Sequence, residues 1–351
     1  MKPFLVSVES GKYPVFLERG ALETLGERMK TMASRVLVVT DEHVWPLYGP
    51  AAQAALQQAA VQADVEVLPA GETTKCAEML FRLYDRLAEL GFTRSDAIVA
   101  FGGGVIGDLA GFAAATWLRG VPLVQVPTTL LAQVDSSIGG KVAIDLPQGK
   151  NLVGAFYQPR FVLMDPAVVK TLPDREFGCG MAEIIKHGAI ADATLFELLE
   201  RKSGRVSVSG NLAAILKRNL SVKRDAVRHD EQDNGQRMKL NFGHTIGHAL
   251  ERRLGYDTIS HGEAVAIGMC HITTRSEALG ITEPGTAARL RALCQAFGLP
   301  TVLDPEVRGS LLETMMLDKK TRGKSITLAL LDKIGSSRLE TVALDQLELF
   351  L

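Results

Sequence analysis

The stretch Asp96-Ala-Ile-Val-Ala-Phe101-Gly102-Gly103-Gly104-Val105-Ile106-Gly107-Asp108 decides the fold. Its first half has the continuous apolar character of a buried strand, and its second half is a glycine turn before an expected helix over 108–118. Gly102, Gly104 and Gly107 match G-x-G-x-x-G, in which glycines let the backbone approach a pyrophosphate at a helix N-terminus. A structural glycine turn matches it too, and a standard Rossmann pattern follows the first strand. We therefore expect a dinucleotide domain of another connectivity, or an α/β domain that binds no dinucleotide.

The chain around this stretch alternates between strand and helix patterns. Strands are expected over 13–17, 35–40, 65–68, 124–129 and 161–164, and helices over 21–32, 50–62 and 76–90. Strands separated by helices of this length predict a parallel sheet with crossover helices. Leu172-Pro173 marks the expected end of this domain, so the first domain is predicted to span residues 1–172.

A long glycine-rich segment interrupts the first domain between 133 and 159. It carries Lys141, Lys150 and Asn151 among its glycines. Such a stretch is costly in chain entropy unless it binds something, and these side chains suit an anionic or polyhydroxylated ligand. The alternative is a solvated loop with incidental lysines.

The second half, residues 173–351, reads as helical. Helices are expected over 175–190, 192–201, 209–230, 240–253, 262–279, 285–297 and 308–316, followed by a small hairpin at 325–331 and 338–343. On the first helix, Glu183 and Lys186 share a face. The choice is between a surface ion pair and a buried carboxylate that needs a partner such as a metal, and the apolar neighbours favour burial.

Histidines gather in Asn241-Phe-Gly-His244-Thr-Ile-Gly-His248-Ala-Leu-Glu251, which is followed by His261-Gly-Glu263. His244 and His248 are four residues apart, so on a helix both rings project from one face, as in many zinc sites. A pair of half-buried or surface histidines is the alternative. Arg237 and Asn241 precede His244 at helical spacing, and we expect all three near one helix face or its entry.

Composition and simple sequence patterns argue against several classes of protein function. The 351 residues are 46% hydrophobic and 23% charged, with a formal net charge of -1, which gives no electrostatic reason to expect nucleic acid or an anionic membrane. The four cysteines show no CxxC spacing, the N-terminus lacks a signal-peptide pattern, and no apolar run reaches a membrane span. We expect a cytoplasmic, metal-assisted enzyme that acts on a phosphorylated or carboxylated sugar-like molecule with a nicotinamide cofactor.

Taken together, these segments resemble the 3-dehydroquinate synthase family, a branch of the sugar phosphate cyclases. The motifs are 102–108, Pro127-Thr-Thr through Gly140-Lys141, Gly149-Lys-Asn151 with 154–159, Ala182-Glu-Ile-Ile-Lys186, 241–248, His261-Gly-Glu263 and Asp318-Lys-Lys320. The resemblance implies a non-standard Rossmann-like NAD-binding α/β domain over 1–172 and a helical metal- and substrate-binding domain over 173–351. It also implies an active site in the cleft between them, NAD with Zn²⁺ or Co²⁺ as cofactors, and a homodimer.

The resemblance further implies the reaction. The substrate would be 3-deoxy-D-arabino-heptulosonate 7-phosphate, which loses phosphate and cyclises to 3-dehydroquinate in the shikimate pathway of aromatic amino-acid biosynthesis. NAD would oxidise one hydroxyl, which allows phosphate elimination, and NADH would return the hydride before ring opening and an intramolecular aldol step. The enzyme would thus be a lyase without net redox change.

The implied site residues fall into three groups. The metal ligands would be Glu183, His244 and His261. Substrate contacts and proton transfer would fall to Lys141, Asn151, Asn241, His248 and Lys320 around the phosphate, Arg119 from a second subunit, Lys223 and Arg237 at the carboxylate, and Lys186 and Asp135 at the hydroxyls. NAD would contact Asp41, Gly71, Glu72, Lys75, Gly103, Gly104, Val105, Ile106, Gly107, Asp108, Thr128, Thr129, Lys141, Lys150, Thr171, Leu172 and Glu176.

The chain departs from the family pattern at His187, Asp145 and Asp233, none of which is an implied ligand or anion clamp. Three rival interpretations remain at this stage. Another sugar phosphate cyclase would share the metal and NAD machinery but bind no substrate carboxylate, whereas a metal-dependent alcohol or glycerol dehydrogenase would consume NAD stoichiometrically. A nucleotide-binding module without catalysis would not need the metal-type residues.

Overall fold

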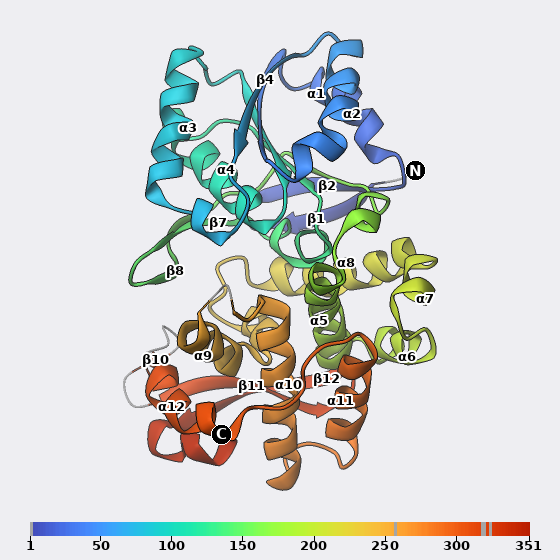
Figure 1. Cartoon of the computed structure of the whole chain (residues 1–351), viewed down its shortest axis with the longest axis vertical. Helices are drawn as coiled ribbons and strands as arrows, with labels where there is room; N and C mark the ends of the chain where they lie inside the picture. Colours follow the sequence, from blue (N-terminus) through green and yellow to red (C-terminus); the bar gives the residue numbers. More distant parts are fainter. Residues whose placement is uncertain (1–2, 256–257, 317–320, 323–324) are drawn as a thin grey trace. The chain divides into compact units, whose positions relative to one another are not determined.

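The computed structural model describes the chain except for residues 1–2, 256–257, 317–320 and 323–324 (Figure 1). The chain divides into two compact units, Met1–Leu172 and Pro173–Leu351. Among the described residues, no helix combines the length and the apolar character that a membrane crossing requires.

The first unit is an α/β unit. Its strands are β1 (Phe4–Val8), β2 (Gly11–Leu17), β3 (Arg35–Asp41), β4 (Gln62–Leu68), β5 (Ala97–Gly102), β6 (Leu123–Pro127), β7 (Lys141–Leu146), β8 (Gly149–Phe156) and β9 (Phe161–Met164). Its helices are α1 (Leu25–Met29), α2 (Val44–Gln58), α3 (Ala77–Glu89) and α4 (Gly104–Thr116). Short helices are η1 (Ala21–Thr24), η2 (Glu72–Thr74), η3 (Trp117–Arg119), η4 (Ala132–Ser136) and η5 (Val168–Thr171).

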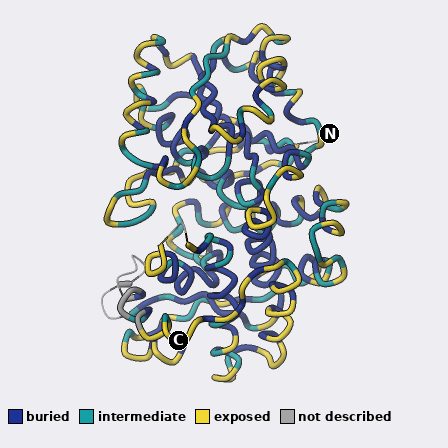
Figure 2. The backbone as a smooth tube through the Cα atoms, in the orientation of Figure 1, coloured by how far each residue is buried: buried dark blue, intermediate teal, exposed yellow. Residues whose placement is uncertain are grey.

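Seven strands form one sheet in the order β1-β2-β9-β6-β5-β3-β4. The pairs from β2 to β4 are parallel, and β1 pairs with β2 antiparallel. Val36 and Val38 of β3 pack with residues of α1 and α2, whereas Leu37 and Val39 pack with residues of α3 and α4. Because helices cover both faces, β5 and β6 are buried along their whole length. Figure 2 shows buried segments in dark blue through the interior of the first unit.

The strand order places a topological switch at β3 and β5. From β3 the chain passes to β4 on one side, and it then returns to β5 on the other side of β3. In open α/β sheets, ligands bind outside the carboxyl ends of the strands at such a point. The glycine turn after β5 therefore lies where a dinucleotide would be expected.

The second unit is mainly helical. Its elements are α5 (Asp174–Ala191), α6 (Ala193–Arg201), α7 (Arg205–Ser209), α8 (Leu212–His229), η6 (Gln236–Asn241), α9 (His244–Leu254), α10 (His261–Ala278), α11 (Thr286–Ala296), α12 (Pro305–Met316) and η7 (Leu344–Phe350). Strands β10 (Thr321–Arg322), β11 (Ser325–Lys333) and β12 (Ser336–Ala343) form a small antiparallel sheet, which includes the expected hairpin.

Helix α10 is the centre of the second unit and packs against α5, α9 and α11. Glycines allow its close approach to two neighbouring segments. A Cβ on Gly268 would lie 2.1 Å from the main-chain oxygen of Gly243, and a Cβ on Gly262 would lie 2.4 Å from Cα of Cys179. Side chains at these two positions would separate α10 from the residues just before α9 and from α5.

The predicted parallel α/β sheet and helical second half are confirmed, but one local expectation is wrong. The glycine-rich segment over 133–159, for which a solvated loop was the alternative, contains η4 and the hairpin β7–β8. The helix expected over 240–253 begins only at His244, since Gly243 has φ 78° and breaks the chain's helical path. Arg237 and Asn241 therefore lie on a separate element, η6, rather than on the helix of His244.

The close approach at Gly268 gives a test of the packing. We expect Gly268→Ala to lower the free energy of unfolding by about 1–3 kcal/mol, because the added methyl group overlaps the backbone at Gly243. Gly309→Ala is the matched control, because a Cβ there meets nothing within 4 Å, and the change should be neutral or stabilising by up to about 1 kcal/mol. Urea unfolding measures both, and equal effects would contradict the packing argument.

Candidate active site

A buried carboxylate and a buried lysine lie on α5. All residues from 177 to 190 are buried, and the side chains of Glu183 and Lys186 are 0% and 1% exposed. The two form an ion pair one turn apart on the helix. The surface ion pair considered from the sequence is therefore excluded, and the carboxylate of Glu183 faces the protein interior.

Three imidazoles lie near Glu183. His244 is the first residue of α9, His248 lies one turn later, and His261 is the first residue of α10. The start of α10 is held by a capping box between Ser260 and Glu263. The ring centroid of His244 is 5.3 Å from that of His248 and 5.2 Å from that of His261, so the three rings form one cluster.

Glu183, His244 and His261 form a group that fits a metal ion. Their ligand atoms all lie within 4.8 Å of one another. Nε2 of His244 is 3.6 Å and Nε2 of His261 is 3.5 Å from the same oxygen, Oε1 of Glu183. Two imidazole nitrogens and a carboxylate oxygen are ligands that zinc takes in sites with open positions, and cobalt binds similar donors. The donor set therefore fits the metal predicted from the sequence.

Glu251 is a residue that the sequence analysis did not assign to the site. Its buried carboxylate lies 3.5 Å from Nδ1 of His261, on the side of the ring opposite Glu183. Burial opposes protonation, but the carboxylates of Glu183 and Glu251 outweigh it and raise the pKa of His261 to about 10. The electrostatic potential that Glu183 and Glu251 create at His261 therefore favours a positive charge, and a bound divalent ion would supply one. A carboxylate at Nδ1 also leaves Nε2 for the metal.

His248 belongs to a second, overlapping group with Glu251 and His261, whose ligand atoms also lie within 4.8 Å of one another. Its half-buried ring is 6.1 Å from that of His261 between centroids. These two groups, both within the second unit, share His261. The group of Glu183, His244 and His261 contains a fully buried carboxylate. The assignment of His248 to the substrate stays a prediction.

The cations expected at a substrate carboxylate are buried. Arg237 on η6 is 2% exposed and Lys223 on α8 is 6% exposed. Nη1 of Arg237 donates a hydrogen bond to the main-chain oxygen of Glu231 at 2.6 Å. Asn241 ends η6 and is half-buried. Lys320 lies outside the described residues.

His187 follows Lys186 on α5 and is fully buried. Its Nδ1 lies 2.7 Å from Oδ1 of Asn219, which is also fully buried on α8. An amide oxygen only accepts, so Nδ1 carries the proton in this hydrogen bond. This departure from the family pattern therefore links α5 to α8.

In the first unit, the predicted NAD residues gather at the carboxyl edge of the sheet. Oδ1 of Asp41, the last residue of β3, accepts hydrogen bonds from the main-chain N–H groups of His43 and Val44, both at 2.9 Å, at the start of α2. A Cβ on Gly103 would lie 3.0 Å from Cγ2 of Thr129, and one on Gly104 would lie 3.3 Å from Oγ of Ser136. The glycines thus serve packing, and Gly103 and Gly104 remain half-buried at the N-terminus of α4.

A charged network lies beside this turn. Nζ of Lys75 is 2.5 Å from Oδ2 of Asp108 and 2.5 Å from Oδ1 of Asn151, and Lys150 pairs with Glu72 at 3.2 Å. Burial would lower the pKa of Lys75, but the carboxylates of Asp108 and Glu72 outweigh it and raise the pKa. The buried lysine is therefore a cation at neutral pH.

The remaining predicted residues lie in both units. Val105, Ile106 and Gly107 are in the first turn of α4, Thr128 follows β6 and Gly71 precedes η2. Thr171 ends η5, and Leu172 follows it. Asp135 is in η4, Lys141 begins β7, and Arg119 is exposed in η3 with φ 68°. Glu176 lies in the first turn of α5, in the second unit.

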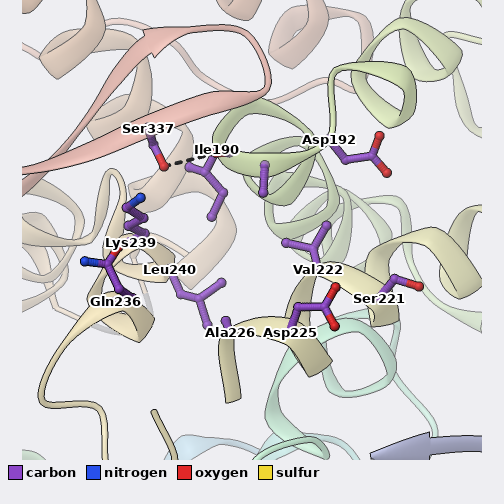
Figure 3. A pocket seen from close by; sticks show the side chains of 11 residues that line it. Ile190, Asp192, Ser221, Val222, Asp225, Ala226, Gln236, Lys239, Leu240 and Ser337 are labelled. Carbon is purple, nitrogen blue, oxygen red and sulfur yellow. Dashed lines mark hydrogen bonds between the residues drawn. The ribbon is translucent and has the colours of Figure 1, made fainter. Parts of the chain in front are cut away.

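A surface pocket of about 360 Å³ lies beside η6 (Figure 3). Its walls come from α5, α8, η6 and β12, and they include Asp225, Gln236, Lys239 and Ser337. Oγ of Ser337 donates to the main-chain oxygen of Ile190 at 3.0 Å. Arg237 and Asn241 do not line it, so this pocket is separate from the candidate substrate residues on the same short helix.

Solved structures show the class to which this fold belongs. The chain resembles 2-deoxy-scyllo-inosose synthase complexed with carbaglucose-6-phosphate, NAD⁺ and Co²⁺ (TM-score 0.87, 26% identity, 99% of this chain and 98% of that one). It also resembles 2-epi-5-epi-valiolone synthase from Streptomyces hygroscopicus with NAD⁺ and Zn²⁺ bound (TM-score 0.86, 27% identity, 96% and 95% covered). Butanol dehydrogenase A from Thermotoga maritima shares only the fold (TM-score 0.66, 16% identity, 90% of each chain). The fold is that of the sugar phosphate cyclases.

Sequence comparisons narrow the class to one family. Residues 65–179 match the 3-dehydroquinate synthase N-terminal model, and residues 180–321 match the C-terminal model. The 3-dehydroquinate synthase of Clostridium acetobutylicum is 45% identical over 344 residues, 97% of each chain, and that of Pelobacter propionicus is 45% identical over 99% of this chain and 98% of its own. The chain belongs to the 3-dehydroquinate synthase family.

The two overlapping histidine groups make different predictions for metal binding. Glu183→Ala and His261→Ala should abolish zinc binding, whereas His248→Ala should retain it, because His248 is not in the group that contains Glu183. Glu251→Gln should weaken zinc binding by about 10- to 100-fold, because the amide holds His261 less firmly. Chelator competition measures all four affinities, and zinc loss in His248→Ala equal to that in His261→Ala would overturn the ligand assignment.

Proposed function

We propose that the chain catalyses the 3-dehydroquinate synthase reaction, the conversion of 3-deoxy-D-arabino-heptulosonate 7-phosphate to 3-dehydroquinate and phosphate. It is then a carbon–oxygen lyase of the shikimate pathway. The observation that carries this proposal is the convergence of Glu183, His244 and His261 in a chain that belongs to this family over nearly its whole length. A non-catalytic module would have no use for a buried carboxylate between two imidazoles.

The cofactors of the proposed reaction are NAD and a Zn²⁺ or Co²⁺ ion. When bound, NAD would take up and return a hydride, and the metal ion would polarise the oxygen that is oxidised. Glu183, His244 and His261 would hold the metal. Lys186, ion-paired with Glu183 on α5, would donate a hydrogen bond to a substrate hydroxyl.

Other residues of the second unit would bind the substrate's charged groups. Lys223 and Arg237 would bind the carboxylate, with the planar guanidinium suited to two parallel hydrogen bonds. Asn241 and His248 would contact the phosphate. The half-buried imidazole of His248 would accept and return a proton there, a role that suits a group whose ordinary pKa is near neutrality.

NAD would bind to the first unit at the topological switch between β3 and β5. The supporting observations are the half-buried glycines at the N-terminus of α4 and the acidic and basic side chains beside it. Lys75 and Lys150 would face the pyrophosphate, and Asp41 and Glu72 would accept hydrogen bonds from ribose hydroxyls. We further propose a cytoplasmic homodimer in which Arg119 reaches the partner, as the family resemblance implies.

The alternatives act on different substrates. Another sugar phosphate cyclase would bind a substrate without a carboxylate, and the burial of both Lys223 and Arg237 favours a carboxylated one. The NADH-dependent butanol dehydrogenase A of Thermotoga maritima shares the fold at 16% identity, whereas the 3-dehydroquinate synthase of Clostridium acetobutylicum is 45% identical. Membership of the 3-dehydroquinate synthase family therefore argues against both alternatives.

The defining test is turnover with a trace of NAD. Incubation of the zinc-loaded protein with the heptulosonate phosphate should release many phosphates per NAD, with no accumulation of NADH, because the hydride returns in each cycle. Phosphate assay, absorbance and product mass measure this outcome. Stoichiometric NADH would identify a dehydrogenase, and phosphate release only from sedoheptulose 7-phosphate would identify another cyclase.

The carboxylate contact gives a second test. Arg237→Lys should raise KM for the heptulosonate phosphate by about 10- to 100-fold, because an ammonium cannot make the paired hydrogen bonds of the guanidinium. Lys239→Ala is the control, since Lys239 lies on the same short helix and lines the separate pocket. Steady-state kinetics measure both, and equal KM values for Arg237→Lys and the unmodified enzyme would remove Arg237 from the substrate site.

A further inference from the structure

The segment that carries Arg237 has little regular structure of its own. Helix α8 ends at His229, and the chain runs through Asp230-Glu-Gln-Asp-Asn-Gly235 before η6 begins at Gln236. Within it, Asp233 has a left-handed φ of 59°. A connection of this kind needs local hydrogen bonds to hold one conformation.

One carboxylate supplies those bonds. Oδ1 of Asp230 accepts a hydrogen bond from the main-chain N–H of Asn234 at 2.9 Å. Oδ2 accepts from the N–H of Gly235 at 2.7 Å and from the N–H of Arg237 at 3.0 Å. Burial would raise the pKa of Asp230, but these N–H donors and the charge of Arg237 outweigh it and lower the pKa. Asp230 is therefore ionised at neutral pH and closes the segment on itself.

The same segment also holds the side chain of Arg237. Its Nη1 donates to the main-chain oxygen of Glu231, the residue next to Asp230, at 2.6 Å. Asp230 thus binds the backbone of Arg237, while its neighbour binds the guanidinium. A buried arginine that is held both at its main chain and at its guanidinium loses little further conformational freedom when it binds an anion.

We propose that Asp230 is a positioning residue, which holds the 230–237 segment so that Arg237 presents its guanidinium to the substrate carboxylate. This inference rests on the proposed function, in which Arg237 binds that carboxylate. A carboxylate is required because three N–H groups share its two oxygens. The amide of asparagine has one acceptor oxygen and no charge to set against the buried guanidinium.

The test compares substrate binding with binding of a smaller anion. Asp230→Asn should raise KM for the heptulosonate phosphate by about 10- to 100-fold, because Arg237 is no longer held. The inhibition constant of inorganic phosphate and the zinc content should stay unchanged, because neither depends on Arg237. Asp225→Asn is the matched control, since this aspartate on α8 is 53% exposed and pairs with Arg224. Changes in all three quantities for Asp230→Asn would show a general structural role and overturn the proposal.

A double-mutant cycle separates positioning from an independent effect. In the Arg237→Ala background, Asp230→Asn should add no further rise in KM, because Asp230 acts through Arg237. Rises in KM that multiply in the double variant would overturn the proposal. Asp230→Glu keeps the charge and provides a second variant if the asparagine variant does not fold.

Amide hydrogen exchange gives a readout without substrate. Asp230→Asn should speed exchange at Asn234, Gly235 and Arg237 while the α8 amides remain protected, and unchanged exchange at the three sites would overturn the positioning role. The unmodified enzyme could release no phosphate while these three amides still lose protection in Asp230→Asn. In that case the proposed function fails, but the positioning of Arg237 by Asp230 stands. The two failures are therefore distinguishable.

Discussion

The second unit depends on the buried carboxylate of Glu183. A fully buried carboxylate is costly in free energy unless cations or hydrogen-bond donors surround it. Lys186 provides a positive charge from the same helix, and His244 and His261 bring imidazoles from the starts of α9 and α10. Helices α5, α9 and α10 must therefore pack so that these side chains converge. Gly262 and Gly268 of α10 allow the close packing that this requires. The metal-type group follows from this packing.

The first unit satisfies a different constraint. Its central strands are buried on both faces, so chemistry is confined to the strand ends, where backbone groups and polar side chains remain accessible. The buried Lys75 is stable there as a cation because Asp108 and Glu72 lie beside it. The two units thus hold charges in opposite ways: one places a lysine and two imidazoles around a carboxylate, and the other places carboxylates around an ammonium.

Much of this arrangement could be predicted from the sequence, and the misses have physical reasons. The apolar run before Gly102 predicted a buried strand correctly, whereas β1 was not expected because only Val6 on it is buried. The helix break at Gly243 was not expected because residues 237–248 keep helical spacing on both sides of it. Glu251 was quoted with the histidines, but its contact with His261 depends on how α9 packs on α10. Asp230 acts on the backbone, and such contacts leave no periodic pattern.

The position of His261 as the first residue of a helix has a kinetic consequence. First turns of helices fray more readily than helix interiors, and opening of this turn would carry the imidazole away from Glu183. The capping box of Ser260 and Glu263, reinforced by Arg175, opposes that opening. The residence time of a bound metal ion is therefore coupled to helix capping at residues that never touch the ion.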